Sequence, residues 1–588
     1  MAPASPNAVQ DAVARCAAGA DAVRCLLDTV PAAELERALF LDPLLPQRVL
    51  PALAGALISA PDDARLPAYI AGTARARTRR LTAIGSWTDA QGEACVRLQL
   101  VDAARFVEDA AFRARVLALL PRAFDRDASA ALRDQLLYSI TSIPGVDYAA
   151  SEAVEWAWGA INRRALTREA PYRAGALAFP DDATDAIAAS FYSFPGPFLD
   201  PDKVARFMSE MRRVRPGREL IALVDLPMRT EIRARTGADG WTLIETHGRE
   251  FSPWPRDPFS VLRRADGGLT FLVRPNVQRQ RGADNDMPLE LIQGLPARLD
   301  AAWGEPTWTR SPAPFHNGQV LLMPGRAWIT IHSVGARVLQ MLGLTSAPDE
   351  GASAAEWRRY RQAGLDAAGE LAALYERPVR FVHELPETLA PGGITALAGG
   401  GGLDLDSLVT MLPQPDGSLR ALVGDVRLGE QLISAAPDDE IARFAATYGM
   451  AAAAPDDLRR RLLAAQQTPR AIGVARFLDA AAAHLRGDVA GVERVPLFLV
   501  AVASLAGADH LRHDHFLITW NNVVLETVDG ARRAEGFASG LAGGDRHAAA
   551  AFARAGYTLD YLPVLAESVI LNGGYRCASQ HVREFEVR

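Results

Sequence analysis

The sequence has no apolar run long enough to cross a membrane. Its longest ones, such as Val495 to Ala503, fall far short of the roughly 20 residues that a transmembrane helix needs. The N-terminus lacks the basic segment and following apolar segment that mark a secretory signal. No block of Lys and Arg stands out, and the formal net charge of −7 is spread along the chain. We therefore expect a soluble cytoplasmic protein that binds neither a membrane nor nucleic acid.

Cysteine is also scarce. The chain has 4 cysteines, Cys16, Cys25, Cys95 and Cys577, with no CxxC pair and no Cys/His spacing typical of a metal site. This usage favours reduced thiols over a disulfide framework. The glycines at 399–402 are not followed by the Gly-Lys-Ser/Thr of a phosphate loop. We therefore expect no metal and no cofactor.

What is present divides the chain in two. Residues 1–180 show apolar residues at helical spacing broken by prolines, which predicts an all-helical N-terminal domain. Residues 181–588 alternate short apolar strands with helices, which predicts an α/β domain of repeated strand–helix modules around one centre. An Ala- and Arg-rich segment at about 428–492 predicts a helical insertion into this domain.

Individual elements can be placed within the second region. We expect strands at 190–194, 219–224, 241–245, 379–382, 516–520 and 559–562, and a hairpin from strands 318–323 and 327–331. Helices are expected at 202–214, 227–236, 352–375 and 545–555.

Cys577 stands in the last part of the chain. The apolar run 568–571 reads as a strand that breaks at Gly573 and Gly574, and glycine permits close approach of a ligand to the backbone. A lone cysteine is often a buried, inert thiol. Two acidic segments far upstream favour a chemical role instead.

The first acidic segment is Trp254-Pro-Arg-Asp257. An aromatic ring and a carboxylate held by neighbouring prolines suit a guanidinium, which stacks on aromatic rings and donates paired hydrogen bonds to carboxylates. The alternative is a turn with a buried tryptophan and an Arg–Asp ion pair.

The second acidic segment is Asp404-Leu-Asp406, which follows the four glycines. On a strand, residues two apart face the same side, so both carboxylates would point together. A cation site or an exposed strand edge would explain the same pattern.

Together these segments resemble a known family. Trp-x-x-Asp, a Gly-rich Asp-x-Asp and a C-terminal Gly-Gly-x-x-Cys occur in the order seen in the guanidine-modifying enzymes of the pentein fold. The region from about residue 190 onward is most similar to the catalytic domain of protein-arginine deiminases, and more distantly to agmatine deiminase. The resemblance implies five strand–helix modules in an α/β propeller around a central funnel.

The resemblance also implies roles for residues. Cys577 would be the nucleophile, Asp257 and Asp406 would bind the substrate guanidinium, and Trp254 would line its alkyl chain. The thiolate would attack the guanidinium carbon, ammonia would leave, and water would release a ureido product. The substrate's own positive charge would help to keep Cys577 ionised. The substrate would be an arginine side chain in a peptide, or a small guanidino compound.

Two residues depart from the family pattern. Where the family has a histidine as general acid/base, this chain has Asp404. Asp404 could carry the proton itself, or His316 in the turn Phe315-His-Asn-Gly could supply it. Alternatively, the site binds a guanidinium and turns over poorly. Arg576 replaces a residue that is often His in relatives, and as a strand neighbour of Cys577 it need not touch the thiol.

Other candidates carry weaker signals. The positions around Asp257 offer no carboxylate for the calcium that animal protein-arginine deiminases bind there, so we expect no calcium at that site. Arg274, Arg279 and Arg281 lie in a predicted loop that could contact substrate or be solvated. His510, His513 and His515 could suggest a metal, although no cysteine accompanies them.

The sequence thus favours a cysteine-dependent deiminase. Two rivals stay open: a pentein-fold guanidinium-binding protein without turnover, and an amidinotransferase, in which an amine replaces water in the second step.

Overall fold

The computed structural model describes residues 165–584, apart from 166, 183, 197–198, 225, 237–239, 247–250, 275–281, 314, 345–347, 349–352, 385–402 and 507–512, and four isolated positions before residue 165. The predicted helical domain at 1–180 lies almost wholly outside the described residues and stays a prediction. Cys25 is disulfide-bonded, contrary to the expectation of reduced thiols, whereas Cys577 is a free thiol. No described helix is both long and apolar enough to span a membrane.

The described chain is a mixed α/β fold of five small sheets. Every sheet contains the same unit, an antiparallel strand pair whose second strand pairs in parallel with a third. One or more helices connect the second strand to the third, because a parallel neighbour requires a crossover. The strand–helix alternation read from the sequence is therefore present. The word module is used below for each of these five units.

The modules follow one another along the chain, and the two ends of the described region share one of them. This shared module pairs β18 (Ser579–Glu584) with β2 (Ala186–Phe194), then β3 (Glu219–Val224) and β4 (Trp241–Glu245). Its helices are α12 (Pro201–Val214) and α13 (Leu226–Thr236). Asp200 caps α12 by accepting bonds from the backbone N–H groups of Asp202 and Lys203.

Two modules follow. One contains β5 (Phe259–Arg264), β6 (Leu269–Val273) and β7 (Thr307–Arg310), with α14 (Met287–Gly294) and α15 (Ala297–Ala302). Strand β1 (Leu177–Ala178) pairs with β5, so the body of sheets already includes residues before 181. The other contains β8 (Val320–Met323), β9 (Arg326–Ile329) and β10 (Val379–Phe381), with α16 (Gly335–Leu342) and α17 (Ala354–Tyr375).

The last two modules include the insertion. One contains β11 (Val409–Pro413), β12 (Leu419–Asp425), β13 (Gly491–Ala501) and β14 (His515–Thr519). Between β12 and β13 lie the insertion helices α19 (Val426–Ala435), α20 (Asp438–Thr447), α21 (Pro455–Gln466) and α22 (Pro469–Leu485). The other contains β15 (Val524–Val528), β16 (Ala531–Phe537) and β17 (Thr558–Leu562), with α23 (Ala542–Arg554).

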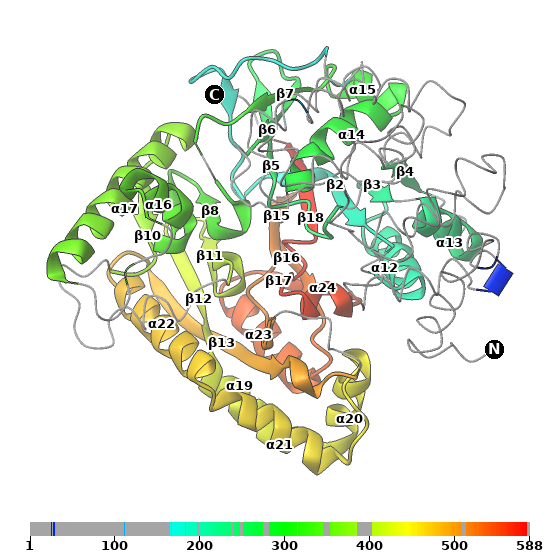
Figure 1. The fold of residues 1–588 in the computed structure, drawn as a ribbon, viewed down its shortest axis with the longest axis vertical. Helices are drawn as coiled ribbons and strands as arrows, with labels where there is room; N and C mark the ends of the chain where they lie inside the picture. Colours follow the sequence, from blue (N-terminus) through cyan, green and yellow to red (C-terminus); the bar gives the residue numbers. More distant parts are fainter. Residues whose placement is uncertain are drawn as a thin grey trace.

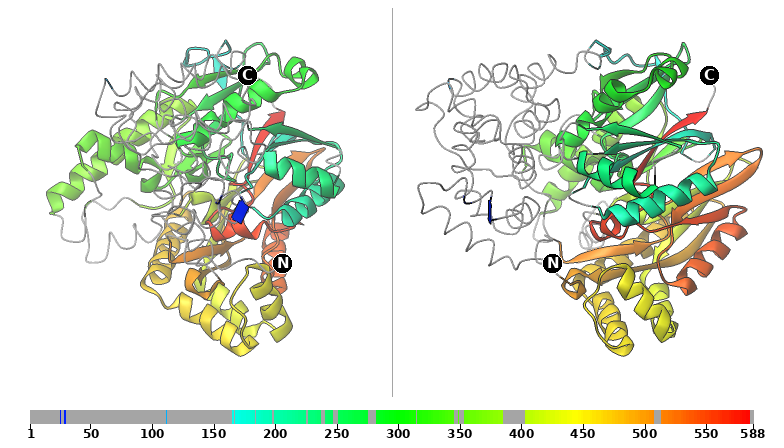
Figure 2. Two further views of the ribbon diagram at one scale, coloured as in Figure 1. Left: turned by 45° about the vertical axis from the view of Figure 1, so that its right-hand side comes forward. Right: turned by 90° about the vertical axis from the view of Figure 1, so that its right-hand side faces the viewer.

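Strands lie at the centre of the molecule and helices surround them (Figure 1). The insertion helices gather at one end (Figure 2). The core between helices and sheets is apolar: α22 and α23 pack on β11 to β13, while α17 packs on β8 and β9. The chemistry-bearing residues lie in the turns that precede the first strands of the modules.

Two predicted strands are absent. Residues 568–570 lie in the short helix α24 (Ala566–Ile570), and Leu571 caps its end by donating its N–H to the Glu567 carbonyl. Asp404 and Asp406 lie in a 3₁₀ turn, Leu405–Ser407, not on a strand. Apolar runs this short do not distinguish a strand from a buried turn of helix, and packing decides.

Candidate active site

The site is built from equivalent positions in the five modules. Each module begins with a strand, and the residue two places before that strand lies close to its counterpart in another module. These residues are Asp257, Gly318, Ser407, Asn522 and Cys577. The residues one place earlier include Arg256, Asn317, Asp406 and Arg576. One fold position used five times therefore gathers residues that are hundreds of positions apart in the sequence.

Cys577 is a free, buried thiol in the turn that precedes β18. The Asn522 side chain holds it from two sides: its Nδ2 donates to Cys577 Sγ at 3.1 Å, and its Oδ1 accepts from the Cys577 backbone N–H at 3.2 Å. Gly574 accepts from Ala578 N–H at 3.0 Å and closes the turn. The sulfur is thus fixed in orientation.

Two carboxylates of the Asp-x-Asp segment lie beside the sulfur. Asp406 is fully buried, and both of its oxygens lie 3.9 Å from Cys577 Sγ. Asp404 is partly exposed, and one of its oxygens lies within 4.8 Å of both the sulfur and Asp406. The expected convergence of the two carboxylates is correct, although a 3₁₀ turn and not a strand produces it.

Asp257 and Trp254 occupy one turn before β5. Asp257 is buried, and its backbone N–H donates to the Trp254 carbonyl at 3.4 Å. The Trp254 indole N–H donates to Ser568 Oγ at 3.1 Å. Its ring lies so close to Gly573 that an added Cβ would meet Nε1 at 1.7 Å. Trp254 therefore packs directly against the turn that carries Cys577.

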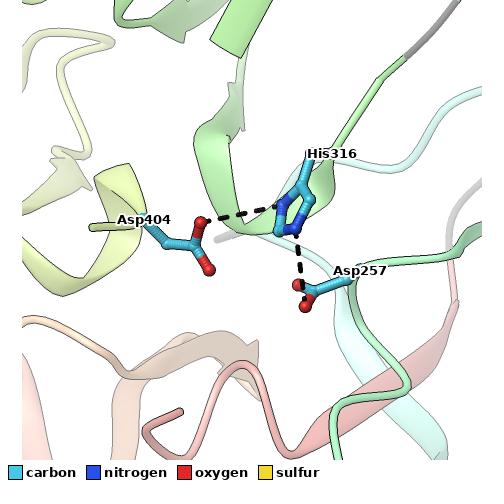
Figure 3. Close-up of side chains that lie close together, drawn as sticks. All are labelled: Asp257, His316 and Asp404. Carbon is cyan, nitrogen blue, oxygen red and sulfur yellow. Dashed lines mark ion pairs between the residues drawn. The ribbon is translucent and has the colours of Figure 1, made fainter. Parts of the chain in front are cut away.

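His316 lies between two carboxylates (Figure 3). Its Nε2 is 3.6 Å from Asp257 Oδ2, and its Nδ1 is 3.8 Å from Asp404 Oδ1. Gly318 follows in the same turn, and a Cβ there would lie 2.7 Å from an Asp404 oxygen and 3.2 Å from an Asp257 oxygen. A side chain at position 318 would fill the space that both carboxylates face.

Arg576 is part of the site through its contact with Asp406, although the prediction said only that it need not touch the thiol. It lies in a turn, so the alternation of strand neighbours does not apply. Its NH1 donates to Asp406 Oδ2 at 2.5 Å, and its NH2 donates to Asp182 Oδ2 at 2.8 Å. Asp182 also accepts from Arg256 at 2.6 Å. All four of these charged residues are buried.

Arg274 is not brought to the sulfur by any contact that the structure shows. It is buried at the end of β6, where its backbone N–H donates to the Pro258 carbonyl and its Nε donates to Asn285. A solvated loop position is therefore wrong for Arg274, while Arg279 and Arg281 lie outside the described residues. His513 bonds to the Ile570 carbonyl, His515 lies on β14, and His510 is not described.

Burial and the neighbouring carboxylates raise the pKa values of Asp406 and Cys577. Burial, helped by the neighbouring Asp257 carboxylate, raises the pKa of Asp406 to about 6 against the influence of Arg576. Burial also raises the pKa of the Cys577 thiol well above its ordinary value, and Asp406, Asp404 and Asp257 add to this effect. Without a bound cation, the thiol is therefore neutral at neutral pH.

Among the described residues, two groups have metal-ligand atoms within 4.8 Å of one another: Asp257, His316 and Asp404, and Asp404, Asp406 and Cys577. Both groups share Asp404 and consist of the residues discussed above. A divalent cation and a guanidinium would therefore compete for the same oxygens.

Reasoning from the sequence missed Asn522, Arg576 and Asp182. For Asn522 and Arg576 a signal existed, since each lies two or three places before a module's first strand, as Asp257 and Asp406 do. Misplaced strand starts concealed it. Asp182 does not precede the first strand of a module, so its contact with Arg576 could not be predicted from the sequence.

The fold and the site define an α/β protein of five modules with a cysteine, carboxylates and a histidine at their centre. No family model matches the sequence, and no curated protein matches it.

Among solved structures, the chain is similar to an agmatine deiminase of Enterococcus faecalis, with 11% identity and a TM-score of 0.42 over 69% of this chain and 95% of that one. It is also similar to a candidate agmatine deiminase solved by X-ray crystallography, with 11% identity and a TM-score of 0.42 over 70% of this chain and 98% of that one. These likenesses assign neither a family nor an activity to the chain.

Proposed function

We propose that this protein is a cysteine-dependent hydrolase that converts a guanidino group into a ureido group and ammonia. The observation that carries the proposal is the placement of the Cys577 sulfur 3.9 Å from both oxygens of buried Asp406, with Asp257 and Asp404 close by. A nucleophile beside an anionic pocket suits an electrophile that is itself a cation. An arginine side chain, in a peptide or in a small molecule, has this chemistry.

Binding would use the two buried carboxylates. Asp257 and Asp406 approach the same space from different modules, so a planar guanidinium between them could donate to both. Bonds to carboxylates on two sides restrict its rotation and present its carbon to the sulfur. Trp254 would line the path of the alkyl chain.

The reaction proceeds in two balanced steps. The Cys577 thiolate attacks the guanidinium carbon, a C–S bond forms, and one C–N bond breaks as that nitrogen takes a proton and leaves as ammonia. Water then attacks the same carbon and gives up its protons, and the C–S bond breaks. The thiolate is restored and the substrate carries a C=O in place of C=NH₂⁺.

Substrate binding also activates the thiol. Three carboxylates oppose the thiolate in the free protein. A guanidinium bound among them contributes a positive charge, which offsets this repulsion and favours the ionised sulfur. The same carboxylates therefore suppress the thiol's reactivity until a cation arrives.

Asp404 is the group best placed to carry the protons. Its carboxylate lies within 4.8 Å of the sulfur and is the more exposed member of the pair, so it can exchange protons with water. His316 lies on the far side of Asp404 and would tune the charge of that carboxylate. This arrangement replaces the histidine that the resemblance leads one to expect.

The test is a colorimetric assay for ureido products after incubation with free arginine, agmatine and an arginine-containing peptide. The proposal predicts a ureido product from at least one of them, and none with Cys577→Ala. The substrate that reacts decides between a peptide and a small molecule. Binding of guanidino compounds without any product would favour the binding protein, and product only with an added amine acceptor would favour an amidinotransferase.

A further inference from the structure

The side chain of Arg576 places a buried positive charge of the protein itself next to the residues that would bind the substrate. Arg576 immediately precedes Cys577, is 4% exposed, and its guanidinium lies against Asp406. In the chemistry proposed above, Asp406 must be ionised to bind a cation. Burial and the neighbouring Asp257 both oppose that ionisation.

The hydrogen bonds of Arg576 fix its position tightly. NH1 donates to Asp406 Oδ2 at 2.5 Å and to the Asn317 carbonyl at 3.3 Å, and NH2 donates to Asp182 Oδ2 at 2.8 Å and to the Val320 carbonyl at 3.2 Å. Its backbone N–H donates to Asn522 Oδ1 at 2.7 Å. A side chain held at this many points cannot move aside to let a substrate take its place.

Asp182 is the anchor of this arrangement. Its backbone N–H donates to the Leu322 carbonyl, its Oδ2 accepts from the Leu322 N–H at 3.1 Å, and its carboxylate binds both Arg576 and Arg256. Of these two arginines, Arg576 is the one that reaches Asp406. Arg256 instead donates to Gln580 at 3.2 Å.

The two oxygens of Asp406 have different partners, and Oδ1 shares its donor with Cys577. Arg576 occupies Oδ2, while Oδ1 accepts from Asn522 Nδ2 at 2.9 Å, the same nitrogen that donates to Cys577 Sγ. Each carboxylate oxygen has two lone pairs, so both retain the capacity to accept from a substrate.

We propose that Arg576 is a positioning residue that keeps Asp406 ionised and oriented for a guanidinium, and that Asp182 holds Arg576 in place. This inference rests on the proposed function, since it assigns Asp406 to substrate binding. A neutral residue at 576 would leave Asp406 buried beside Asp257 with only the weaker attraction of Arg256 to compensate, and Asp406 would bind a proton in place of the substrate.

The test compares two alkylating reagents of the same shape, cationic 2-chloroacetamidine and neutral 2-chloroacetamide. Mass spectrometry gives the rate at which each modifies Cys577 across pH. The ratio of the rates reports the negative charge of the pocket, because both reagents need the same thiolate. In the wild-type protein this ratio should rise as the pH increases through the titration of Asp406.

In Arg576→Met the pH at which the ratio rises should move upward by at least about one unit, which makes the ratio roughly threefold lower near pH 6.5 and roughly tenfold lower near pH 5. Arg576→Lys keeps the charge and should restore most of the wild-type profile. Arg583→Met is the matched control: Arg583 is equally buried but bonds to the carbonyls of Asp182 and Asp185, so its loss should lower stability and leave the profile in place.

An unchanged profile in a folded Arg576→Met protein would overturn the proposal, as would equal losses in the Met and Lys variants. Arg576→Gln serves if the Met variant does not fold, and failure of both neutral variants to fold would assign Arg576 to the fold alone. A wild-type protein that shows the pH-dependent ratio but forms no ureido product would reject the proposed turnover and leave the role of Arg576 intact.

Discussion

At the residue scale, the surroundings of Cys577 oppose ionisation of its thiol. The sulfur is buried, accepts a hydrogen bond from the neutral Asn522 amide, and faces three carboxylates. A nearby cation or a helix N-terminus can activate a cysteine in the free protein, but here burial and the three carboxylates outweigh Arg576. The site therefore suits a thiol that reacts with cations and little else.

Proton transfer is the first property to test at this scale. Asp404→Asn should lower kcat by about 10²–10⁴, because general acid–base help of that size is lost with the ionisable group. His316→Gln should have a smaller effect on kcat, since His316 contacts Asp404 and not the sulfur. Steady-state kinetics of both variants over pH would check this, and a larger loss in His316→Gln would transfer the proton-carrying role to His316.

The second property to test at the residue scale is the role of Asp257 in substrate binding. Asp257→Asn should weaken binding of a guanidino ligand by roughly 10- to 150-fold, since a hydrogen bond to a charged group contributes about 1.5–3 kcal/mol. Calorimetric titration of the Cys577→Ala background measures binding without turnover. Ser260→Ala is a suitable control, because Ser260 bonds to Asn317 behind the turn. Equal affinities in the Asp257→Asn variant and the parent protein would remove Asp257 from the binding site.

At the scale of elements, the site depends on short turns before strands. The turn of Trp254 and the turn of Cys577 touch at Gly573, where any Cβ would collide with the indole. Gly573→Ala should therefore displace Trp254 or the Cys577 turn and reduce kcat/KM at least tenfold, since misplacement by about 1 Å far from the chemistry can cost 10²-fold.

Gly335→Ala provides the matched control for this glycine. An added Cβ there meets nothing within 4 Å, and the residue begins helix α16. Activity and melting temperature should stay close to those of the wild type in the control. Full activity in Gly573→Ala would show that the contact between the two turns does not position the site.

These turns also explain how far sequence reasoning reached. Strands β3 and β4 agree with the prediction to the residue, because buried β-branched and apolar runs bounded by turns are strong local signals. The turns gave weaker signals. The expected convergence of Asp404 and Asp406 is correct but the strand assigned to them is wrong, and the strand assumed for Arg576 is a turn. Asn522 lies two places before a module's first strand, but its partners Asp406 and Cys577 belong to other modules, so its role becomes clear only in the folded chain.

At the scale of the whole molecule, buried histidines link stability to pH. Burial lowers the pKa of His383 to about 4 from the ordinary value of 6.5. The folded state keeps His383 neutral, as an acceptor for the Ile331 N–H, while the unfolded chain protonates below pH 6.5. This contribution is therefore complete above pH 6.5 and is lost as the pH falls toward 4, by up to about 3 kcal/mol.

Denaturant unfolding of the wild type and of His383→Gln between pH 7.5 and 4 would measure this linkage. The difference in free energy of unfolding between them should shrink as the pH falls. Asp406 contributes with the opposite sign, since its raised pKa favours the folded state as the pH falls below about 6; the comparison between variants cancels it. His547→Gln, in helix α23, is the control. A pH-independent difference would refute the role of His383.

The most direct measurement is peptide mass spectrometry of a reaction quenched in acid while a guanidino substrate turns over. The account predicts an adduct on Cys577 with the mass of the substrate less ammonia, which forms before the ureido product and disappears as the substrate is consumed. Ureido product that accumulates with Cys577 unmodified at every quench time, and equally in Cys577→Ala, would contradict the account.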